Sequence, residues 1–240
     1  MRLTAFPWDG STSLDLSSPA LLPARSNVKR QTAAAAGVPK PPVPGLVETF
    51  VHLVKMKEFV CLCLGYIPVM MMRTSLTNWT AVMFASKNLS LATAAACMST
   101  LELGGFAGGL SGGWITDKIG GRRGPVMCCF SIMCAPLSLA VQAAVQARST
   151  AFFLPVAYFL HGFFSFPPHS LIGLLAREKT PPMMRSTAGC LAKAVGQLGA
   201  VLAGYPLQVL AARAGWQVVG PINAICGVVA AGIFLPLWRS

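Results

Sequence analysis

The chain has 240 residues, of which 54% are hydrophobic and 11% are charged, and its mean hydropathy is +0.62. A soluble domain of this length cannot bury so much apolar surface in one core, so the composition indicates a protein of the lipid bilayer. The net charge of +12 would favour nucleic acid as the partner of a soluble protein, but here the basic residues lie in short segments between apolar runs. We therefore expect no nucleic-acid partner.

Residues 1–50 are rich in Ser, Ala, Pro and Thr and contain no apolar run long enough to cross a bilayer. We predict a disordered, low-complexity tail for this segment. Its Arg and Ser content is compatible with an organellar transit peptide, although Asp9 and Asp15 weaken that interpretation.

Six apolar stretches follow the tail, and each has the ~20 residues that a helix needs to span a bilayer. The sequence therefore predicts an all-α membrane protein, a six-helix bundle built from residues 51–240. The predicted spans are residues 59–83, 91–115, 125–146, 151–175, 187–210 and 217–237.

Basic residues are distributed unequally between the two sides of these spans, nine on one side and three on the other. Because Lys and Arg accumulate in cytoplasmic loops, the richer side, which includes both termini, is expected to be cytoplasmic. The nine are Lys55, Lys57, Lys118, Arg122, Arg123, Arg177, Lys179, Arg185 and Arg239, and the three are Lys87, Arg148 and Arg213.

The side chains that catalysis or metal binding would require do not form recognisable patterns. All eight cysteines lie in the apolar stretches, and no Cys-x-x-Cys pair or Cys/His metal spacing occurs among them. No nucleophile–base pair, phosphate-binding glycine loop or pair of carboxylates is evident either. We therefore expect neither an enzyme nor a protein with a cofactor or a metal ion.

Two charged residues within the spans are the strongest candidates for function, because an ionisable group in hydrocarbon costs several kcal/mol unless it is paired or faces water. Arg73 lies a little past the middle of the first span, and Glu102 lies in the second. A guanidinium presents a planar fork of donors that suits phosphate oxygens. Arg73 is therefore expected to bind an anionic substrate, with Glu102 as its partner. The alternative is that the two charges only neutralise each other.

Lys193 and His169 are weaker candidates for the same binding site. Lys193 lies about two turns into the fifth span, so its ammonium either faces a cavity or extends back to the cytoplasmic surface. His169 follows Pro167 and Pro168, which we expect to interrupt the fourth helix at membrane depth. A histidine at this place either borders a substrate site or makes a hydrogen bond within the packed bundle.

Glycine-rich stripes occur in the second span, at 104–113, and in the fifth, at 196–204. Small residues let membrane helices approach closely, and they also let helices slide or rock against one another. The sequence leaves open which of the two roles the stripes have.

A charged turn, GGWITDKIGGRRG at residues 112–124, separates the second and third spans. We expect three glycines, at 120, 121 and 124, to permit a tight reversal with positive φ. The turn is either a gating latch or a loop that only obeys the positive-inside rule. The pattern D-[KR]-x-G-[RK]-[RK] resembles the signature loop of the major facilitator superfamily, with one extra glycine. We assign the gating role to Asp117, Lys118, Gly121, Arg122 and Arg123.

Further stretches resemble, in order, the carboxy-terminal half of the organophosphate:phosphate antiporters of that superfamily, which include transporters of glycerol 3-phosphate, hexose phosphates and glucose 6-phosphate. They are residues 73–79 (RTSLTNW), Glu102 through Trp114 to Lys118, Pro168 with residues 171–173 (LIG), Glu178 with Pro181, residues 186–188 (STA), Gly199 with residues 203–206 (AGYP), and residues 215–216 (GW).

This resemblance implies exchange of a sugar phosphate or glycerol phosphate for inorganic phosphate by alternating access. Family members hold the phosphate between two basic residues, one from each half, and Arg73 matches the residue of the second half. Glu102 matches a carboxylate that engages this arginine. Some relatives do not transport, so a membrane sensor or assembly partner is the alternative function. Relatives occur in the endoplasmic reticulum, the plasma membrane and the plastid envelope, and the sequence does not select among them.

Relatives have twelve spans, whereas this sequence contains six. Alternating access needs two bundles that move around a central site. We therefore expect the chain to be a fragment of a longer transporter, with two alternatives: a half that pairs with a separate amino-terminal half, and a homodimer.

Overall fold

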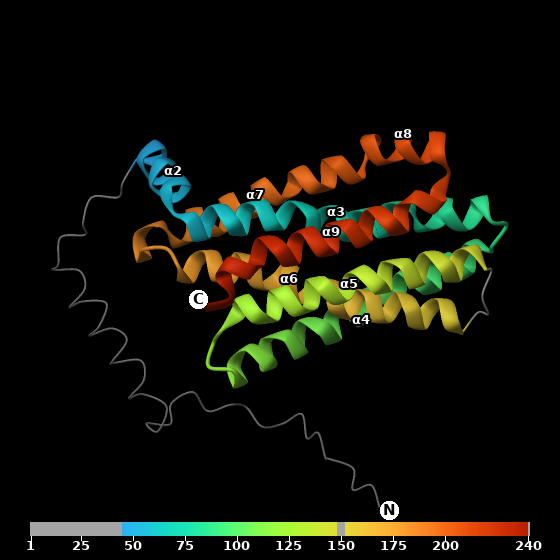
Figure 1. The fold of residues 1–240 in the computed structure, drawn as a ribbon, viewed down its shortest axis with the longest axis horizontal. Helices are drawn as coiled ribbons and strands as arrows, with labels where there is room; N and C mark the ends of the chain where they lie inside the picture. Colours follow the sequence, from blue (N-terminus) through green and yellow to red (C-terminus); the bar gives the residue numbers. More distant parts are fainter. Residues whose placement is uncertain (1–44, 148–151, 240) are drawn as a thin grey trace, which may run out of the picture. The chain divides into compact units, whose positions relative to one another are not determined.

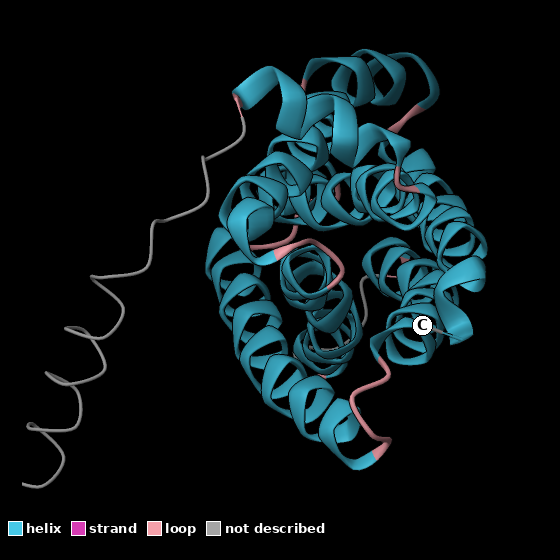
Figure 2. Ribbon diagram, turned by 90° about the vertical axis from the view of Figure 1, so that its left-hand side faces the viewer, coloured by secondary structure: helices cyan, strands magenta, loops and turns pink. Residues whose placement is uncertain are grey.

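The computed structural model describes residues 45–147 and 152–239. These residues form helices and turns with no β-strand among them, so the predicted all-α fold is confirmed (Figures 1 and 2). Most of the predicted tail lies outside the described residues. Residues 46–50, which we assigned to the tail, instead form the first half of a helix.

The helices follow the six predicted apolar stretches, with α2 added before them and the fifth stretch divided in two. Short 3-10 helices lie at Pro182–Met184, Trp216–Val218 and Leu235–Arg239. The α-helices are α2 (Leu46–Lys55), α3 (Lys57–Ser86), α4 (Leu91–Lys118), α5 (Arg123–Gln146), α6 (Phe153–Glu178), α7 (Arg185–Ala203), α8 (Tyr205–Ala214) and α9 (Val219–Phe234).

Four helical segments are apolar and long enough to cross a membrane: residues 57–86, 123–146, 182–214 and 216–238. Helices α4 and α6 are equally long but are not among the four, since glycines, prolines and polar residues lower their hydropathy. The four segments establish an integral membrane protein by length and composition.

The fifth predicted span is two helices rather than one. Gly204, with φ −82° and ψ −118°, leaves the helical region between α7 and α8. Pro206 then occupies the first turn of α8, where a missing N–H costs least. The Trp79 indole Nε1 of α3 donates to the Ala203 carbonyl at 2.6 Å, so the polar backbone at the end of α7 has a partner.

Helix α6 continues through Pro167 and Pro168, so the predicted interruption of this helix is wrong. The two prolines cannot donate to the carbonyls of Phe163 and Phe164, four residues earlier. The Phe163 carbonyl lies directly against Gly108 of α4. A membrane helix tolerates proline where a neighbouring helix covers the backbone groups that proline leaves without a donor.

The glycine stripe of α4 packs against α6. A Cβ on Gly104 or Gly108 would collide with the carbonyl oxygen of Phe159 or Phe163, and a Cβ on Gly162 of α6 would collide with the carbonyl oxygen of Leu101. The two backbones therefore touch without intervening side chains, which is the close approach that small residues permit.

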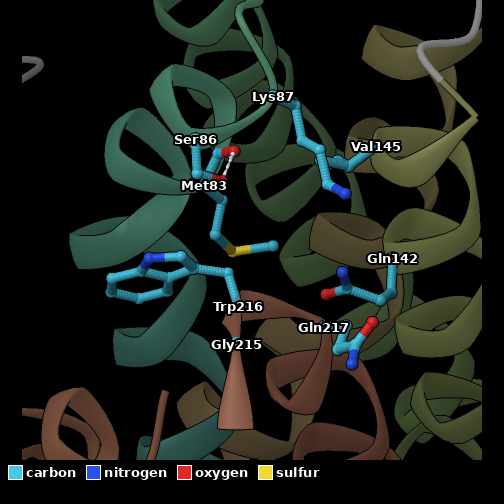
Figure 3. A pocket seen from close by; sticks show the side chains of 8 residues that line it. All are labelled: Met83, Ser86, Lys87, Gln142, Val145, Gly215, Trp216 and Gln217. Carbon is cyan, nitrogen blue, oxygen red and sulfur yellow. Dashed lines mark hydrogen bonds between the residues drawn. The ribbon is translucent and has the colours of Figure 1, made fainter. Parts of the chain in front are cut away.

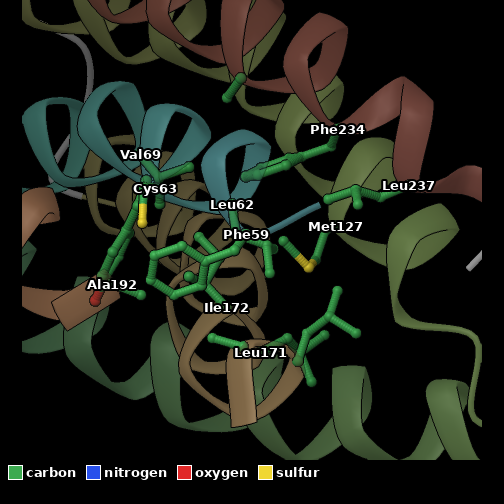
Figure 4. Packing of buried hydrophobic residues seen from close by; sticks show 14 of the residues in the cluster. Phe59, Leu62, Cys63, Val69, Met127, Leu171, Ile172, Ala192, Phe234 and Leu237 are labelled. Atoms are coloured by element: carbon green, nitrogen blue, oxygen red, sulfur yellow. The ribbon is translucent and has the colours of Figure 1, made fainter. Parts of the chain in front are cut away.

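Helices α5 and α9 pack against each other, α9 also packs against α3, and α5 also packs against α6 (Figure 1). At the end of the bundle where α3 begins, a buried apolar cluster joins these four helices. Figure 4 shows Leu62 of α3, Met127 of α5, Ile172 of α6 and Phe234 of α9 within it, each fully buried. This packing fixes α3 and α6 and leaves their other sides for a functional site.

Candidate functional site

Arg73 and Glu102 form an ion pair between the middle of α3 and the middle of α4. The Arg73 Nη2 atom lies 3.3 Å from the Glu102 Oε2 atom, and the two side chains are 25% and 55% exposed. The Arg73 Cζ atom also lies 4.8 Å from the centroid of the Phe166 ring of α6, a cation–π contact. The guanidinium is thus positioned by a carboxylate and an aromatic face, and it remains partly accessible.

A hollow of about 350 Å³ lies beside this ion pair, between α4 and α6. This volume is at the lower end of the usual range for small-molecule sites. Its lining is mixed: it has the carboxylate of Glu102, the Ser170 side chain and the apolar side chains of Phe106, Leu110 and Phe166. The hollow can therefore accept a small polar molecule next to Arg73.

His169 extends the site along α6. Its Nδ1 atom is 2.9 Å from the Tyr66 hydroxyl of α3, and its ring centroid is 5.7 Å from that of Phe166. Tyr66 precedes Arg73 by seven residues, so the two lie on the same face of α3. His169 thus contacts both the Phe166 ring, which lies over Arg73, and the Tyr66 hydroxyl of α3.

Lys193 of α7 reaches towards the same part of α6. A Cβ on Gly173, one turn after His169, would lie 3.2 Å from the Lys193 Cε atom. The four residues that we predicted for substrate binding therefore face one region between α3, α4, α6 and α7. Their role in binding stays a prediction.

The sequence analysis did not identify three further residues of this region. Tyr66 and Phe166 are uncharged and resemble ordinary packing residues in an apolar run, and Ser170 is a single hydroxyl. The signal that would have found them is helical spacing: Phe166 precedes His169 by three residues, and Tyr66 precedes Arg73 by seven.

The charged turn between α4 and α5 is formed by two glycines. Gly120 and Gly121 have φ of +75° and +80°, and the Gly121 N–H donates to the Thr116 carbonyl at 2.8 Å. The predicted reversal is thus present at these two positions. Gly124 has a different role, since it lies within α5 and a Cβ there would collide with the Leu237 carbonyl.

One residue of the predicted latch makes an ion pair between helices. The Arg123 Nη1 atom lies 2.7 Å from Glu178 Oε2 at the end of α6. The Nζ atom of the adjacent Lys179 lies 3.6 Å from Glu58 Oε2 at the start of α3. The two pairs connect α5, α6 and α3 at one end of the bundle. Our latch assignment did not include the three partners, because nothing in the local pattern of the turn points to segments 55 to 65 residues away.

The other charged residues of the turn make no such connection in the part of the chain that the structure describes. Lys118 Nζ lies 3.9 Å from the ring centroid of Trp114 on its own helix. Asp117 and Arg122 are exposed, and neither takes part in an ion pair between described residues. Within the predicted latch, the contact between helices therefore depends on Arg123.

A second hollow, of about 300 Å³, lies at the opposite end of the bundle. The side chains of Lys87, Gln142 and Gln217 line it (Figure 3). The Gln142 Oε1 atom accepts a hydrogen bond from the Gly220 N–H at 3.3 Å, which holds the buried amide in place. This hollow contains none of the four predicted binding residues.

Comparison with known proteins finds relatives that are named as hexose phosphate transporters or as a membrane sensor. The chain is 33% identical over 170 residues to a probable hexose phosphate transport protein of Chlamydia muridarum, 32% identical over 182 residues to the membrane sensor protein UhpC of Salmonella typhimurium, and 29% identical over 185 residues to the hexose-6-phosphate:phosphate antiporter of Escherichia coli K12. These alignments cover 70%, 75% and 72% of this chain but only 37%, 40% and 39% of the relatives. The chain thus spans about two fifths of the length of these relatives.

The family match covers more of the chain than any single motif. Residues 62–239 match the Major Facilitator Superfamily, from the first turns of α3 to the end of the last 3-10 helix. The matched segment includes Arg73, Glu102 and the charged turn after α4. The chain belongs to the major facilitator superfamily.

Proposed function

We propose that this chain is the phosphate-binding half of a transporter that exchanges a phosphorylated sugar for inorganic phosphate by alternating access. The observation that carries the proposal is the place of Arg73: a partly accessible guanidinium in the middle of a membrane helix, beside a hollow. The names of two relatives, a hexose phosphate transport protein and a hexose-6-phosphate:phosphate antiporter, supply the substrate class.

The exchange chemistry follows from the ion pair. The guanidinium keeps its charge at every working pH, so it needs an anionic partner both when the site is empty and when substrate is bound. In the empty state the Glu102 carboxylate supplies that partner, and a bound phosphate replaces it with two parallel hydrogen bonds to the guanidinium fork. The phosphate dianion wins this competition because it brings more charge than a single carboxylate.

His169 and Lys193 extend binding to the rest of the substrate. The Lys193 ammonium provides a second positive charge on the α6–α7 side, and the His169–Tyr66 pair provides polar contacts for hydroxyl groups. The Phe166 and Phe106 rings contribute apolar surface for a sugar ring.

The proposed topology has six spans, with both termini and the α4–α5 turn on the cytoplasmic side. Helices α4 and α6 cross the bilayer together with the more apolar spans because they run alongside them in the bundle (Figure 1). The Arg123–Glu178 and Lys179–Glu58 pairs then hold α5, α6 and α3 at the cytoplasmic end. Alternating access further requires a second bundle, supplied by another part of a longer chain, a separate half or a second copy.

The test measures phosphate binding and exchange separately. Equilibrium binding of radiolabelled phosphate to the detergent-purified chain should be lost in Arg73→Ala and kept in Arg213→Ala, a matched control at the exposed end of α8. In proteoliposomes that contain the assembled transporter, Arg73→Ala should also abolish counterflow between phosphate and hexose phosphate. Unchanged phosphate binding by Arg73→Ala would overturn the proposal.

A non-transporting membrane sensor is the second candidate function. The observation that favours it is the 32% identity to a membrane sensor protein, which lies between the 33% identity to the hexose phosphate transport protein of Chlamydia muridarum and the 29% identity to the antiporter of Escherichia coli. A sensor would bind hexose phosphate through Arg73 but show no counterflow in the same proteoliposomes. The two measurements therefore separate the two functions.

A further inference from the structure

Helix α2 exposes an apolar surface although it is short and rich in polar residues. Leu53 and Thr49 are buried against the rest of the bundle, 0% and 4% exposed. Four other apolar side chains of α2 are open to the surroundings, between 45% and 74% exposed. They are Val47, Phe50, Val51 and Val54.

The side chains of α2 fall on three separate faces. At about 100° per residue, the four exposed apolar side chains occupy one stripe, and the buried side chains lie next to it on one side. Glu48, His52 and Lys55 lie next to it on the other side. A helix at a protein–water boundary needs only a buried and a polar face. An additional exposed apolar face is typical of a helix that lies in a membrane interface.

An apolar groove continues this stripe onto the bundle. It has a volume of about 190 Å³, lies between α2, α3 and α7, and its lining has no polar surface. The lining includes Phe50, Val54, Phe59, Leu64, Leu191 and Val195.

The groove opens away from the candidate substrate site. Leu191 and Lys193 are two residues apart on α7, which places them about 200° apart around the helix. Since Lys193 reaches towards α6, the groove lies on the other side of α7. A groove without polar lining on this side of the membrane helices suits a lipid acyl chain.

The position of α2 along the bundle places the stripe at the membrane surface. Met56, with φ −80° and ψ 109°, is the only residue between α2 and the membrane helix α3, which begins at Lys57 (Figure 1). Helix α2 is thus held at the level where α3 enters the bilayer.

Two lysines are close in sequence to the residues that line the groove. Lys57 precedes Val60 and Leu64, both in the lining, by three and seven residues, so all three share one face of α3. Lys55 lies on the polar face of α2, next to Val54. The nearby Glu58 is paired with Lys179, and neither Lys55 nor Lys57 takes part in an ion pair among the described residues.

We propose that α2 and this groove form a binding site for an anionic phospholipid. One acyl chain occupies the groove, the stripe lies at the boundary between headgroups and hydrocarbon, and Lys55 and Lys57 bind the charged headgroup. The proposal depends on the membrane position of α3 alone and is independent of transport.

The first experiment measures the depth of the stripe in the full-length chain in lipid nanodiscs. A fluorescent amino acid is placed at position 51, in the stripe, or at position 52, on the polar face, as the matched control. Position 51 should be quenched by lipid labelled near the top of the acyl chain and protected from aqueous iodide, and position 52 should show the reverse. If position 51 is quenched by iodide, or if neither quencher reaches it because protein covers it, the proposal is overturned.

The second experiment measures lipid selectivity at position 51, with the quencher carried by phosphatidylglycerol or by phosphatidylcholine at equal mole fraction. Each lysine should favour the anionic lipid by about five-fold at low salt. The Lys55→Gln/Lys57→Gln double variant should lose this preference, and Lys87→Gln, at the other end of the bundle, should keep it. Equal quenching by the two lipids in the unmodified chain would refute a headgroup-specific site.

Discussion

Replacing Gly108 by alanine directly tests the contact between the backbones of α4 and α6, which we call the α4–α6 seam. A Cβ at this position would lie 2.7 Å from the carbonyl carbon of Phe163 and 2.8 Å from its Cα atom, closer than non-bonded carbon atoms approach. Both atoms belong to the backbone, so no side chain can rotate away. The two helices must separate by roughly 1 Å, which removes a quarter to a half of the dispersion energy across their contact.

The loss of unfolding free energy through overpacking at position 108 can be separated from the intrinsic preference of a helix for alanine over glycine. Overpacking typically costs about 1–3 kcal/mol, whereas alanine is about 1 kcal/mol more favourable than glycine inside a helix. Gly113→Ala is the matched control on the same helix, because no atom lies within 4 Å of a Cβ there. The gain from alanine is the same in both variants and cancels, so we expect Gly108→Ala to be less stable than Gly113→Ala by about 1–3 kcal/mol.

The assay is reversible unfolding of the detergent-solubilised chain by sodium dodecyl sulfate, followed by circular dichroism. The two variants have the same composition and the same helix, so the difference between their unfolding free energies reports the seam alone. Equal stability of the two variants would show that the backbones of α4 and α6 do not touch as described.

Three further predictions concern side chains. Glu102→Gln removes the competitor for Arg73, so phosphate should bind about ten-fold more tightly, a gain of about 1.4 kcal/mol, while its counterflow slows. A double-mutant cycle on Arg123 and Glu178 should give a coupling energy of about 1 kcal/mol that falls in high salt, since the carboxylate is 46% exposed. Trp79→Phe removes the hydrogen bond at the end of α7 and should destabilise the chain by about 1–2 kcal/mol in the same unfolding assay.

Each of these predictions has its own control. Glu48→Gln, on α2, should leave phosphate affinity unchanged, and tighter binding in that variant would remove the argument from Glu102. Exchanging the charges of Arg123 and Glu178 should restore most of the stability that either single change removes. Trp114→Phe affects an indole that is 60% exposed, and a loss as large as that of Trp79→Phe would contradict the role of the Trp79 hydrogen bond.

The sequence predicts the candidate site better than it predicts the ends and breaks of helices. Arg73 and Glu102 can be recognised because a charge inside an apolar run requires a partner or a cavity. The contacts around them, by contrast, involve Tyr66 and Phe166, whose neutral side chains give no such signal. Spacing along a helix locates residues on one face, but it does not say which helix that face contacts.

The differences between prediction and structure have one physical origin, contacts between segments far apart in the chain. Pro167 does not break α6 because Gly108 of another helix covers the carbonyl that it leaves without a donor. Gly124 serves a contact with Leu237, 113 residues away, rather than the turn. Helix α2 was missed because the Pro-rich composition of residues 1–50 obscured a short helical period at its end.

The interruption at Gly204 divides the fifth span into an inner helix, α7, and an outer helix, α8. Since Pro206 has no N–H, the change of direction at this place costs no helical hydrogen bond from that residue, and the Trp79 indole satisfies the Ala203 carbonyl. Helix α7 stays fixed because the backbone at Gly199 touches that of α3 at Ile67. The outer segment α8 can therefore run in its own direction and pack against the bundle through Leu207 and Ala211, while the inner segment, with Lys193, keeps its position against α3.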